Sequence, residues 1–282
     1  MPPLEIVVCI KPVPDPKRWK KLELDPETML LRRTAIPAVM NQLDRNAVEQ
    51  AVLLKESRGA TISVLTMAPA SADEQLLEAI AMGCDRAYLV SDKAAAGADT
   101  LATARVLSAA IRRIGSFDLV FCGAYSQDGS TSSVGPQVAE LLGLPELTYA
   151  VGLDVEGSVV RAQCKVENGE ATYEAGLPAL VTFDREANVP RPPTMTGIMR
   201  AKQAEIVCWT TADLGLRPET VGLAGSPTQM LNVFKPAVGR KGEMLQGSPN
   251  DVVAALVSRL RADGAIPNLS RTESPNLNRT EH

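Results

Sequence analysis

One loop of the sequence combines glycines, a row of hydroxyl residues and a single carboxylate. It reads GAYSQDGSTSSVG at residues 123–135, follows an apolar run at residues 119–122 and leads into a segment with apolar residues at helical spacing. The start of a helix offers free backbone N–H groups and the positive end of the helix dipole, and both favour a bound phosphate. Serine and threonine hydroxyls add further hydrogen-bonding groups. These residue types therefore predict a phosphate-binding turn between a strand and a helix.

The spacing within this loop narrows the chemistry. Gly123, Gly129 and Gly135 are six residues apart, which matches neither the dinucleotide fingerprint G-x-G-x-x-G nor a Walker motif. No lysine follows to bind a terminal phosphate, so the loop favours a nucleotide that is held over one that is hydrolysed. The carboxylate of Asp128 has two open interpretations: it could cap the helix, or it could accept a hydrogen bond from a ribose or a ring N–H.

A second loop, SDKAAAGADTLAT at residues 91–103, carries a similar signal. Asp99 is well placed as the N-cap of a helix, with Thr100 and Thr103 in its first turn. Capping explains the aspartate but not the run of small residues before it. Because small residues let a flat or phosphorylated ligand approach the backbone, capping and ligand contact both stay open for this loop.

The chain lacks the side chains of the common catalytic and metal sites. Its only histidine is His282, the last residue, which nearly excludes serine–histidine, cysteine–histidine and histidine–metal chemistry. We therefore expect no metal site and no catalytic residue. The five cysteines form no C-x-x-C pair, and we expect reduced, buried thiols in a reducing compartment.

Charge and hydropathy exclude two further classes of protein. The net charge of −4 argues against nucleic-acid binding, which needs a basic surface. No apolar run approaches the roughly 20 residues that span a bilayer, and the N-terminus MPPLEIVVCI lacks the charged region of a signal peptide. We expect a cytoplasmic protein without direct membrane insertion.

The elements that must position these loops alternate in type along the first half of the chain. Strands are predicted at residues 5–10, 61–67, 86–90 and 116–122, and helices at residues 43–57, 72–82, 99–114 and 131–142. This alternation predicts an α/β fold with a parallel sheet covered on both faces, in which ligands bind beyond the carboxyl ends of the strands. The KPVPD stretch at residues 11–15 is then either a rigid turn or a wall of that site.

The second half of the chain has a different pattern. Short strands at residues 151–156, 159–166 and 170–175, separated by glycine-containing turns, predict an antiparallel extension, and a buried strand follows at residues 178–184. From Val189 the sequence is rich in proline and predicts irregular structure. A helix is predicted at residues 249–262, followed by a polar, disordered tail.

Several stretches together resemble the β subunit of electron transfer flavoproteins, over roughly residues 4–264. The most specific is PRPPTMTGIMRAKQAEI at residues 190–206. The others are VVCIKPVPD (7–15), VMNQLDRNAVEQAVLLKE (39–56), TMAP (66–69), AIAMGCDRAYLVSD (79–92), GADTLATA (97–104) and the loop at residues 123–135.

The resemblance implies a fold, a domain organisation and a partner. Residues 1–189 would form a Rossmann-like, adenine nucleotide alpha hydrolase-like domain, with the antiparallel strands within residues 151–175. Residues 190–264 would form a partner-recognition loop and an arm that wraps an α subunit carrying one FAD, and residues 265–282 a disordered tail. The cofactor, not the protein, would carry the redox step.

The family has two branches, which differ in what the β subunit holds. In the ordinary branch the β site holds a structural AMP. In the electron-bifurcating branch it holds a second FAD that takes a hydride from NADH and splits the electrons. One electron goes through the α-subunit FAD to an acyl-CoA dehydrogenase, the other to ferredoxin or flavodoxin.

This sequence is more similar to the bifurcating branch. It has Ser132, Ser133 and Val134 where the ordinary branch has asparagine, glutamine and threonine. The stretches DGSTSSVGPQVAELLGL, VSDKAAAGADTLATA and GSPTQMLNVFKP point the same way, although Ser130 and Ser133 depart from that branch's usual residues. The resemblance thus implies FAD, with AMP as the alternative, and NAD as a substrate. Whether the chain is itself an enzyme stays open.

The resemblance also implies which residues line the sites. The nucleotide site would be formed by Cys9, Asn41, Met67, Ala68, Gly123, Asp128, Gly129, Ser130, Thr131, Ser132, Ser133, Val134 and Gly135, and Asp99, Thr100 and Thr103 would contact the flavin and its chain. Met195, which composition alone assigns to the core, would anchor the partner, with Arg200 and Lys202 as basic neighbours.

Two rival functions stay open. The chain could be a binding subunit that holds AMP and stabilises an α subunit that alone carries electrons. The small-residue loops by themselves also fit a stand-alone nucleotide-binding domain of the stress-protein type. The long segment after Pro190 argues against this last reading, because an isolated domain has no use for it.

Overall fold

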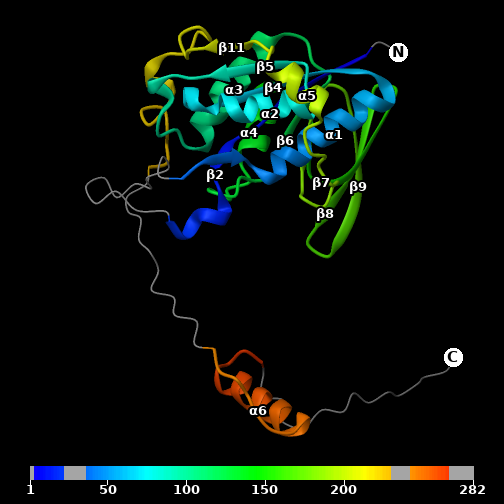
Figure 1. Ribbon diagram of the computed structural model, residues 1–282, viewed down its shortest axis with the longest axis vertical. Coiled ribbons are helices and arrows are strands. Elements are labelled where there is room, and N and C mark those ends of the chain that lie inside the picture. Colours follow the sequence, from blue (N-terminus) through cyan, green and yellow to red (C-terminus); the bar gives the residue numbers. More distant parts are fainter. Residues whose placement is uncertain (1–2, 22–35, 230–241, 267–282) are drawn as a thin grey trace, which may run out of the picture. The chain divides into compact units, whose positions relative to one another are not determined.

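The computed structural model describes residues 3–21, 36–229 and 242–266 (Figure 1). The chain divides into two compact units, Met1–Val233 and Phe234–His282. The first unit contains the sheet and all the loops discussed above. The second contains one described helix, α6 (Pro249–Ala262), whose bounds match the predicted helix and which begins at a capping box of Ser248 and Asp251.

A nine-stranded sheet organises the first unit. In spatial order its strands are β11 (Ile206–Trp209), β5 (Arg86–Val90), β4 (Ala60–Met67), β1 (Leu4–Cys9), β6 (Leu119–Gly123), β10 (Ala179–Phe183), β7 (Glu146–Glu156), β8 (Val159–Val166) and β9 (Gly169–Gly176). The pairs from β11 to β7 are parallel, whereas β8 is antiparallel to both β7 and β9. The predicted α/β fold with a small antiparallel extension is confirmed.

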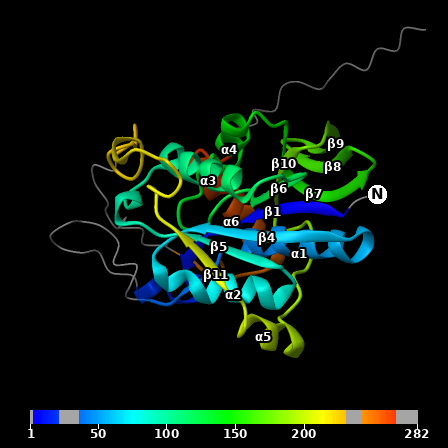
Figure 2. The same cartoon turned by 90° about the horizontal axis from the view of Figure 1, so that it is seen from above.

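Helices cover both faces of the sheet, as expected for parallel strands. They are α1 (Gln42–Arg58), α2 (Asp73–Met82), α3 (Thr100–Ile114) and α4 (Val134–Leu142). The side chains of β1 divide by alternation: Ile6 and Val8 pack in one core cluster with α1 and α2, and Val7 and Cys9 in another with α3 and α4. Figure 2 shows α3 and α4 on one side of β1 and β4, and α2 on the other.

The antiparallel extension begins earlier than its pattern suggests. β7 starts at Glu146, pairs in parallel with β10 through its first residues and turns antiparallel to β8 beyond Ala150. Both ladders change register here, and Tyr149 has a positive φ of 57°. β7 is thus the strand at which the sheet changes from parallel to antiparallel pairing.

The prediction of irregular structure after Val189 is wrong for residues 195–201 and 206–209. Met195–Ala201 form a short helix, α5, because the Thr194 side chain accepts a hydrogen bond from the Gly197 N–H and caps it. Residues Ile206–Trp209 add β11 to the edge of the sheet beside β5. Trp209 stacks on Tyr88 of β5 with ring centroids 5.1 Å apart.

Two short strands outside the main sheet lie after β1. They are β2 (Pro12–Pro14) and β3 (Ala38–Met40), paired antiparallel, and a 3-10 helix at Pro16–Lys21 lies between them in the chain. Residues 12–14 of the KPVPD stretch therefore form a short paired strand, and the role of the stretch as a wall of a ligand site stays a prediction. Residues 267–282 of the predicted tail, and residues 230–236 of the GSPTQMLNVFKP stretch, lie outside the described residues.

The structure also bears on the expectations about cysteines, membrane-spanning helices and metal-ligating side chains. All five cysteines are free; four are buried, as predicted, but Cys208 on the edge strand is exposed. Within residues 3–21, 36–229 and 242–266, no helix has the length and apolar character that crossing a membrane requires. The same residues contain no cluster of metal-ligating side chains.

Candidate functional site

The carboxyl ends of β1 and β6 are joined by one carboxylate. Asp44, in the first turn of α1, accepts hydrogen bonds from the backbone N–H of Lys11 at 2.7 Å and of Gly123 at 3.0 Å. The Asp44 side chain is buried, with 6% of its residue surface exposed. These bonds fix the start of α1 against the exits of two neighbouring strands in the middle of the sheet.

Burial and hydrogen bonding act on Asp44 in opposite directions. Desolvation raises its pKa from 3.8 to about 7, against hydrogen bonds from Asn41, Lys11 and Gly123 that favour the charged form. The close contact also explains the glycine at position 123. A Cβ there would lie 2.3 Å from Asp44 Oδ1, so no side chain fits.

Asn41, at the N-cap position of α1, holds the first half of the hydroxyl loop. Its Nδ2 donates to the Tyr125 carbonyl at 2.9 Å, and its Oδ1 accepts from the Gln127 N–H at 3.1 Å. Asn41 is fully buried, so both bonds satisfy a side chain that has no access to water. Asn41 thus holds the loop in place, and its contact with a nucleotide stays a prediction.

Lys11 links the exit of β1 to the same loop. Its Nζ donates to Asp128 Oδ1 at 2.7 Å and to Ser126 Oγ at 3.2 Å. Asp128 is therefore paired with Lys11, and the N-cap position of α4 is held by Ser133, without a side-chain capping bond. The reason is that Lys11 lies within reach of the carboxylate and offers a charged donor.

The hydroxyl residues occupy a tight turn rather than the first turn of α4. The helix begins at Val134, not at residue 131, because Ser130 and Ser132 have positive φ values of 49° and 54°. Tyr149 Oη donates to Ser132 Oγ at 2.7 Å, while Gly129, Ser130 and Thr131 are exposed. Backbone N–H groups at the start of α4 and exposed hydroxyls thus share one turn.

Gly135 allows α4 to approach the sheet. A Cβ at this position would lie 2.6 Å from Thr182 Cγ2 on β10. The Thr182 hydroxyl accepts a hydrogen bond from the Tyr149 N–H at 3.0 Å. The N-terminus of α4 is therefore held at a fixed distance from β10, beside the turn.

Asp99 caps α3, as predicted. Its Oδ1 accepts from the Ala102 N–H at 2.9 Å and its Oδ2 from the Thr228 N–H at 3.0 Å, while its own N–H donates to Ser226 Oγ at 2.8 Å. Burial opposes ionisation of Asp99, but the N–H donors outweigh it and keep its pKa below the usual value. The aspartate thus ties the start of α3 to a distant segment of the chain.

The small residues before Asp99 accommodate that segment. Leu223 N–H donates to the Ala96 carbonyl at 3.0 Å, and a Cβ at Gly222 would lie 2.0 Å from the Ala94 carbonyl oxygen. The close approach of residues 222–223 explains why the residues before Asp99 are small, so no ligand is needed to explain them. Contact of Thr100 and Thr103 with a flavin stays a prediction.

Most of the predicted nucleotide-site residues meet at one edge of the sheet. Cys9, Met67 and Gly123 end β1, β4 and β6, Asn41 and Asp99 precede α1 and α3, and the hydroxyl turn follows β6. Hydrogen bonding to Cys9 and burial raise the pKa of the Cys122 thiol well above its usual value, so this thiol stays protonated. The carboxyl edge is where the parallel fold predicts a ligand.

The predicted partner residues lie elsewhere, on α5 beside the C-terminal end of α2. Met195 is 77% exposed and Met199 57%, so the assignment of Met195 to the core by composition is wrong. Arg200 donates to the carbonyl oxygens of Ile80 at 2.6 Å and Cys84 at 3.1 Å. Arg200 therefore fastens α5 to the end of α2, whereas Lys202 is exposed.

Sequence reasoning missed several residues of the carboxyl edge. Asp44 gives only a weak signal in the sequence, as an acidic residue in the first turn of the helix that follows Asn41. Tyr149 gave none, because its partner Ser132 is brought to it only by the pairing of β7 with β10. For Lys11 the sequence leaves two interpretations, a residue of a rigid turn or of a ligand-site wall. Its contact with Asp128 shows that it also holds the loop at residues 123–135.

A mostly parallel α/β sheet with a hydroxyl-rich turn at its carboxyl edge places the chain in the Rossmann-like class of folds, in which ligands bind at that edge. The family model "Electron transfer flavoprotein domain" matches residues 28–214, more than half of the chain. The chain belongs to the electron transfer flavoprotein β-subunit family.

Relatives cover nearly the whole chain. It is 40% identical over 264 residues to "Electron transfer flavoprotein subunit beta" of Thermoanaerobacterium thermosaccharolyticum, covering 93% of this chain and 100% of that protein. It is 40% identical to "Caffeyl-CoA reductase-Etf complex subunit CarD" of Acetobacterium woodii, covering 92% and 98% of the two chains. It is 36% identical to "Protein FixA" of Azorhizobium caulinodans, covering 91% and 94%.

Proposed function

We propose that this chain binds FAD at the carboxyl edge of its sheet and, paired with an α subunit, accepts hydride from NADH. The electrons would divide between the α-subunit FAD, with an acyl-CoA dehydrogenase beyond it, and ferredoxin or flavodoxin. The observation that carries the proposal is the turn at residues 129–133, which places the exposed hydroxyls of Ser130 and Thr131 beside the start of α4. The alternative is a structural AMP in the same place.

The chain's own residues fit the phosphates of a nucleotide. The first N–H groups of a helix have no partner within the helix, and Ser133 supplies no capping bond here. Ser130 and Thr131 are exposed beside them, and Lys11 neutralises the one carboxylate of the loop. A flavin held there would supply the hydride and one-electron chemistry, while these residues bind and orient it.

Two observations favour FAD over AMP. Serine, serine and valine at residues 132–134 replace the asparagine, glutamine and threonine of the ordinary branch. Among the relatives, one is named as a subunit of a caffeyl-CoA reductase-Etf complex and another as "Acryloyl-CoA reductase electron transfer subunit gamma", from Anaerotignum propionicum. These names support electron transfer with an acyl-CoA-type redox partner.

The apolar face of α5 fits the docking of that partner. Met195, Ile198 and Met199 are all exposed on one seven-residue helix, with Lys202 at its end. Exposed apolar side chains on a fixed helix act as binding anchors. We propose that this face contacts an acyl-CoA dehydrogenase-type protein.

The experiment that tests the cofactor is a nucleotide count. The chain is co-expressed with its α subunit, the complex is denatured, and the released nucleotides are quantified by chromatography. Two FAD per heterodimer and no AMP are expected, and an NADH titration of the flavin absorbance follows. One FAD and one AMP would instead support the structural-subunit alternative.

A further inference from the structure

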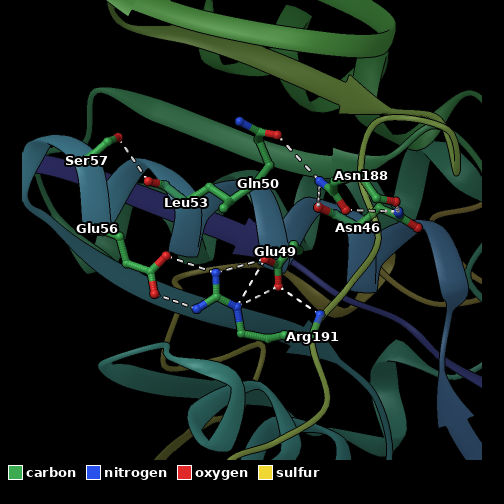
Figure 3. Close-up of polar contacts among 8 residues, drawn as sticks. All are labelled: Asn46, Glu49, Gln50, Leu53, Glu56, Ser57, Asn188 and Arg191. Carbon is green, nitrogen blue, oxygen red and sulfur yellow. Dashed lines mark hydrogen bonds and ion pairs between the residues drawn. The ribbon is translucent and has the colours of Figure 1, made fainter.

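The chain between β10 and α5 is fastened along α1 (Figure 3). Asn46 Nδ2 donates to the Asn188 carbonyl at 2.8 Å and to the Arg185 carbonyl at 3.2 Å. In return, Asn188 Nδ2 donates to the Asn46 carbonyl at 3.1 Å and to Gln50 Oε1 at 3.4 Å. Three residues after Asn46 on α1, at Glu49, the contacts change from amide groups to charged groups.

Arg191 makes the most extensive of these contacts. Its backbone N–H donates to Glu49 Oε2 at 3.0 Å, and its Nε and Nη2 donate to the same carboxylate at 2.9–3.0 Å. Nη1 and Nη2 also donate to Glu56, at 2.5 and 2.9 Å. One guanidinium thus bridges two carboxylates that lie two turns apart on the same helix, as the dashed lines in Figure 3 show.

Burial makes this contact obligatory. The Glu49 side chain is 5% exposed, that of Arg191 28% and that of Glu56 56%. A buried carboxylate without a charged partner is strongly unfavourable, so Glu49 requires the guanidinium at this place. Hydrogen bonds to Glu56 and Glu49 raise the pKa of Arg191, and the bond from Arg191 lowers the pKa of Glu56.

The helix that follows needs such support. α5 has seven residues, and an isolated helix of that length is unstable in water. α5 also packs on the end of α2: in its first turn a Cβ at Gly197 would lie 2.0 Å from the Ala81 carbonyl oxygen, and in its last turn Arg200 donates to two carbonyl oxygens. Arg191, four residues before Met195, fixes the near end to α1.

We propose that Arg191 is a positioning residue: its ion pair with the buried Glu49 holds α5, and with it Met195 and Met199, in the orientation that the protein partner meets. The inference rests on the proposed function insofar as α5 is the docking helix. Because the helix is ordered before the partner arrives, docking does not carry the entropy cost of ordering it. Arg191 would influence partner binding without contacting the nucleotide.

The first experiment measures the order of α5 without any partner. Amide hydrogen exchange is followed by mass spectrometry on the α–β complex, in peptides that contain residues 195–202. Arg191→Met is expected to speed exchange there about tenfold, which corresponds to about 1.4 kcal/mol. Arg161→Met is the matched control, because Arg161 forms an exposed ion pair with Glu174 on another part of the sheet. Unchanged exchange in Arg191→Met would overturn the proposal.

A second variant separates positioning from the cost of an unpaired charge. Arg191→Met leaves Glu49 buried without a partner, which could disturb α1 itself. The double variant Glu49→Met/Arg191→Met removes both charges and should still speed exchange in α5, while the peptides of α1 keep their protection. Arg191→Lys keeps the charge but not the two-carboxylate fork, so an intermediate rate is expected.

The last experiment measures docking, with a purified short-chain acyl-CoA dehydrogenase and its acyl-CoA as the probe. The double variant should raise the KM for the α–β complex about tenfold, with kcat and flavin content unchanged. If Met195→Ala raises the KM but the double variant does not, the positioning role is overturned. If neither raises it while exchange in α5 still increases, the docking assignment in the proposed function fails instead.

Discussion

Asp44 is a buried carboxylate with two backbone N–H donors, and opposing effects act on its ionisation. The N–H groups of Lys11 and Gly123 favour the charged form of Asp44, and burial favours the neutral form. Burial prevails to the extent that the pKa reaches about 7, against 3.8 for an ordinary aspartate. The residue that joins β1 to β6 therefore changes charge in the physiological range.

The stability of the fold should depend on pH through Asp44. An acid whose pKa is raised in the folded state stabilises that state below its ordinary pKa, and this contribution is lost as the pH rises to the folded value. Asp44→Asn cannot titrate, and its amide N–H2 faces one of the two backbone donors, which costs about 1–3 kcal/mol. The thermal midpoint of the α–β complex should be higher for wild type at pH 5, and the difference should shrink up to about pH 7.

The control for this prediction is the pH range above 7. There the difference between wild type and Asp44→Asn should become constant, because Asp44 is ionised in both the folded and the unfolded chain. A difference that stays the same from pH 5 to pH 8 would show that Asp44 is already charged in the folded protein.

At the scale of elements, a clear periodic pattern of apolar residues predicts a helix or strand correctly, whereas short elements without such a pattern are not predicted. The helix at residues 249–262 and the strand at residues 86–90 were predicted at their observed bounds, because each has a capping or apolar signal of its own. α5 and β11 were missed, since seven and four residues show no period. Local chemistry likewise predicted the Asp99 cap, three residues from its donor, but not Asp44 with Gly123, 79 residues apart.

The first turn of α3 allows the cap and the cofactor contact to be separated. Asp99→Ala with Thr103→Val should reduce flavin in the β site and leave the α-site flavin bound. Asp99→Ala alone also removes the hydrogen bond from the Thr228 N–H. Loss of the helix cap should lower the free energy of unfolding by about 0.5–2 kcal/mol. Thr103→Val keeps the cap, so a roughly fivefold faster release of the β-site flavin, about 1 kcal/mol, would report contact alone.

The release is measured by ultrafiltration and fluorescence of the freed flavin. Thr172→Val on β9 removes a hydroxyl far from the carboxyl edge and serves as the matched control. Equal loss of flavin from both sites in the double variant would contradict the assignment of this turn to the β site.

At the scale of the whole first unit, α1 serves two sites. Its start, through Asn41 and Asp44, holds the loop at residues 123–135 and the exits of β1 and β6. Its middle, through Glu49, holds the segment that leads to α5. One helix thus positions both the proposed cofactor site and the proposed docking helix. Because different residues of α1 make the two sets of contacts, each set can be changed separately.

Removal of the β-site nucleotide should lower the stability of the first unit of the chain. A ligand that binds only the folded state adds RT ln(1 + [L]/Kd), about 2.7 kcal/mol at a hundredfold excess over Kd. In a complex stripped of its β-site nucleotide, FAD should raise the thermal midpoint more than AMP at equal concentration, because a dinucleotide brings a diphosphate to the turn.

Gly135→Ala should abolish the rise, since a Cβ there would lie 2.6 Å from Thr182 Cγ2 and displace the start of α4. Gly176→Ala, where a Cβ meets nothing within 4 Å, should leave it intact. A rise with AMP as large as that with FAD would favour the structural nucleotide over the second flavin.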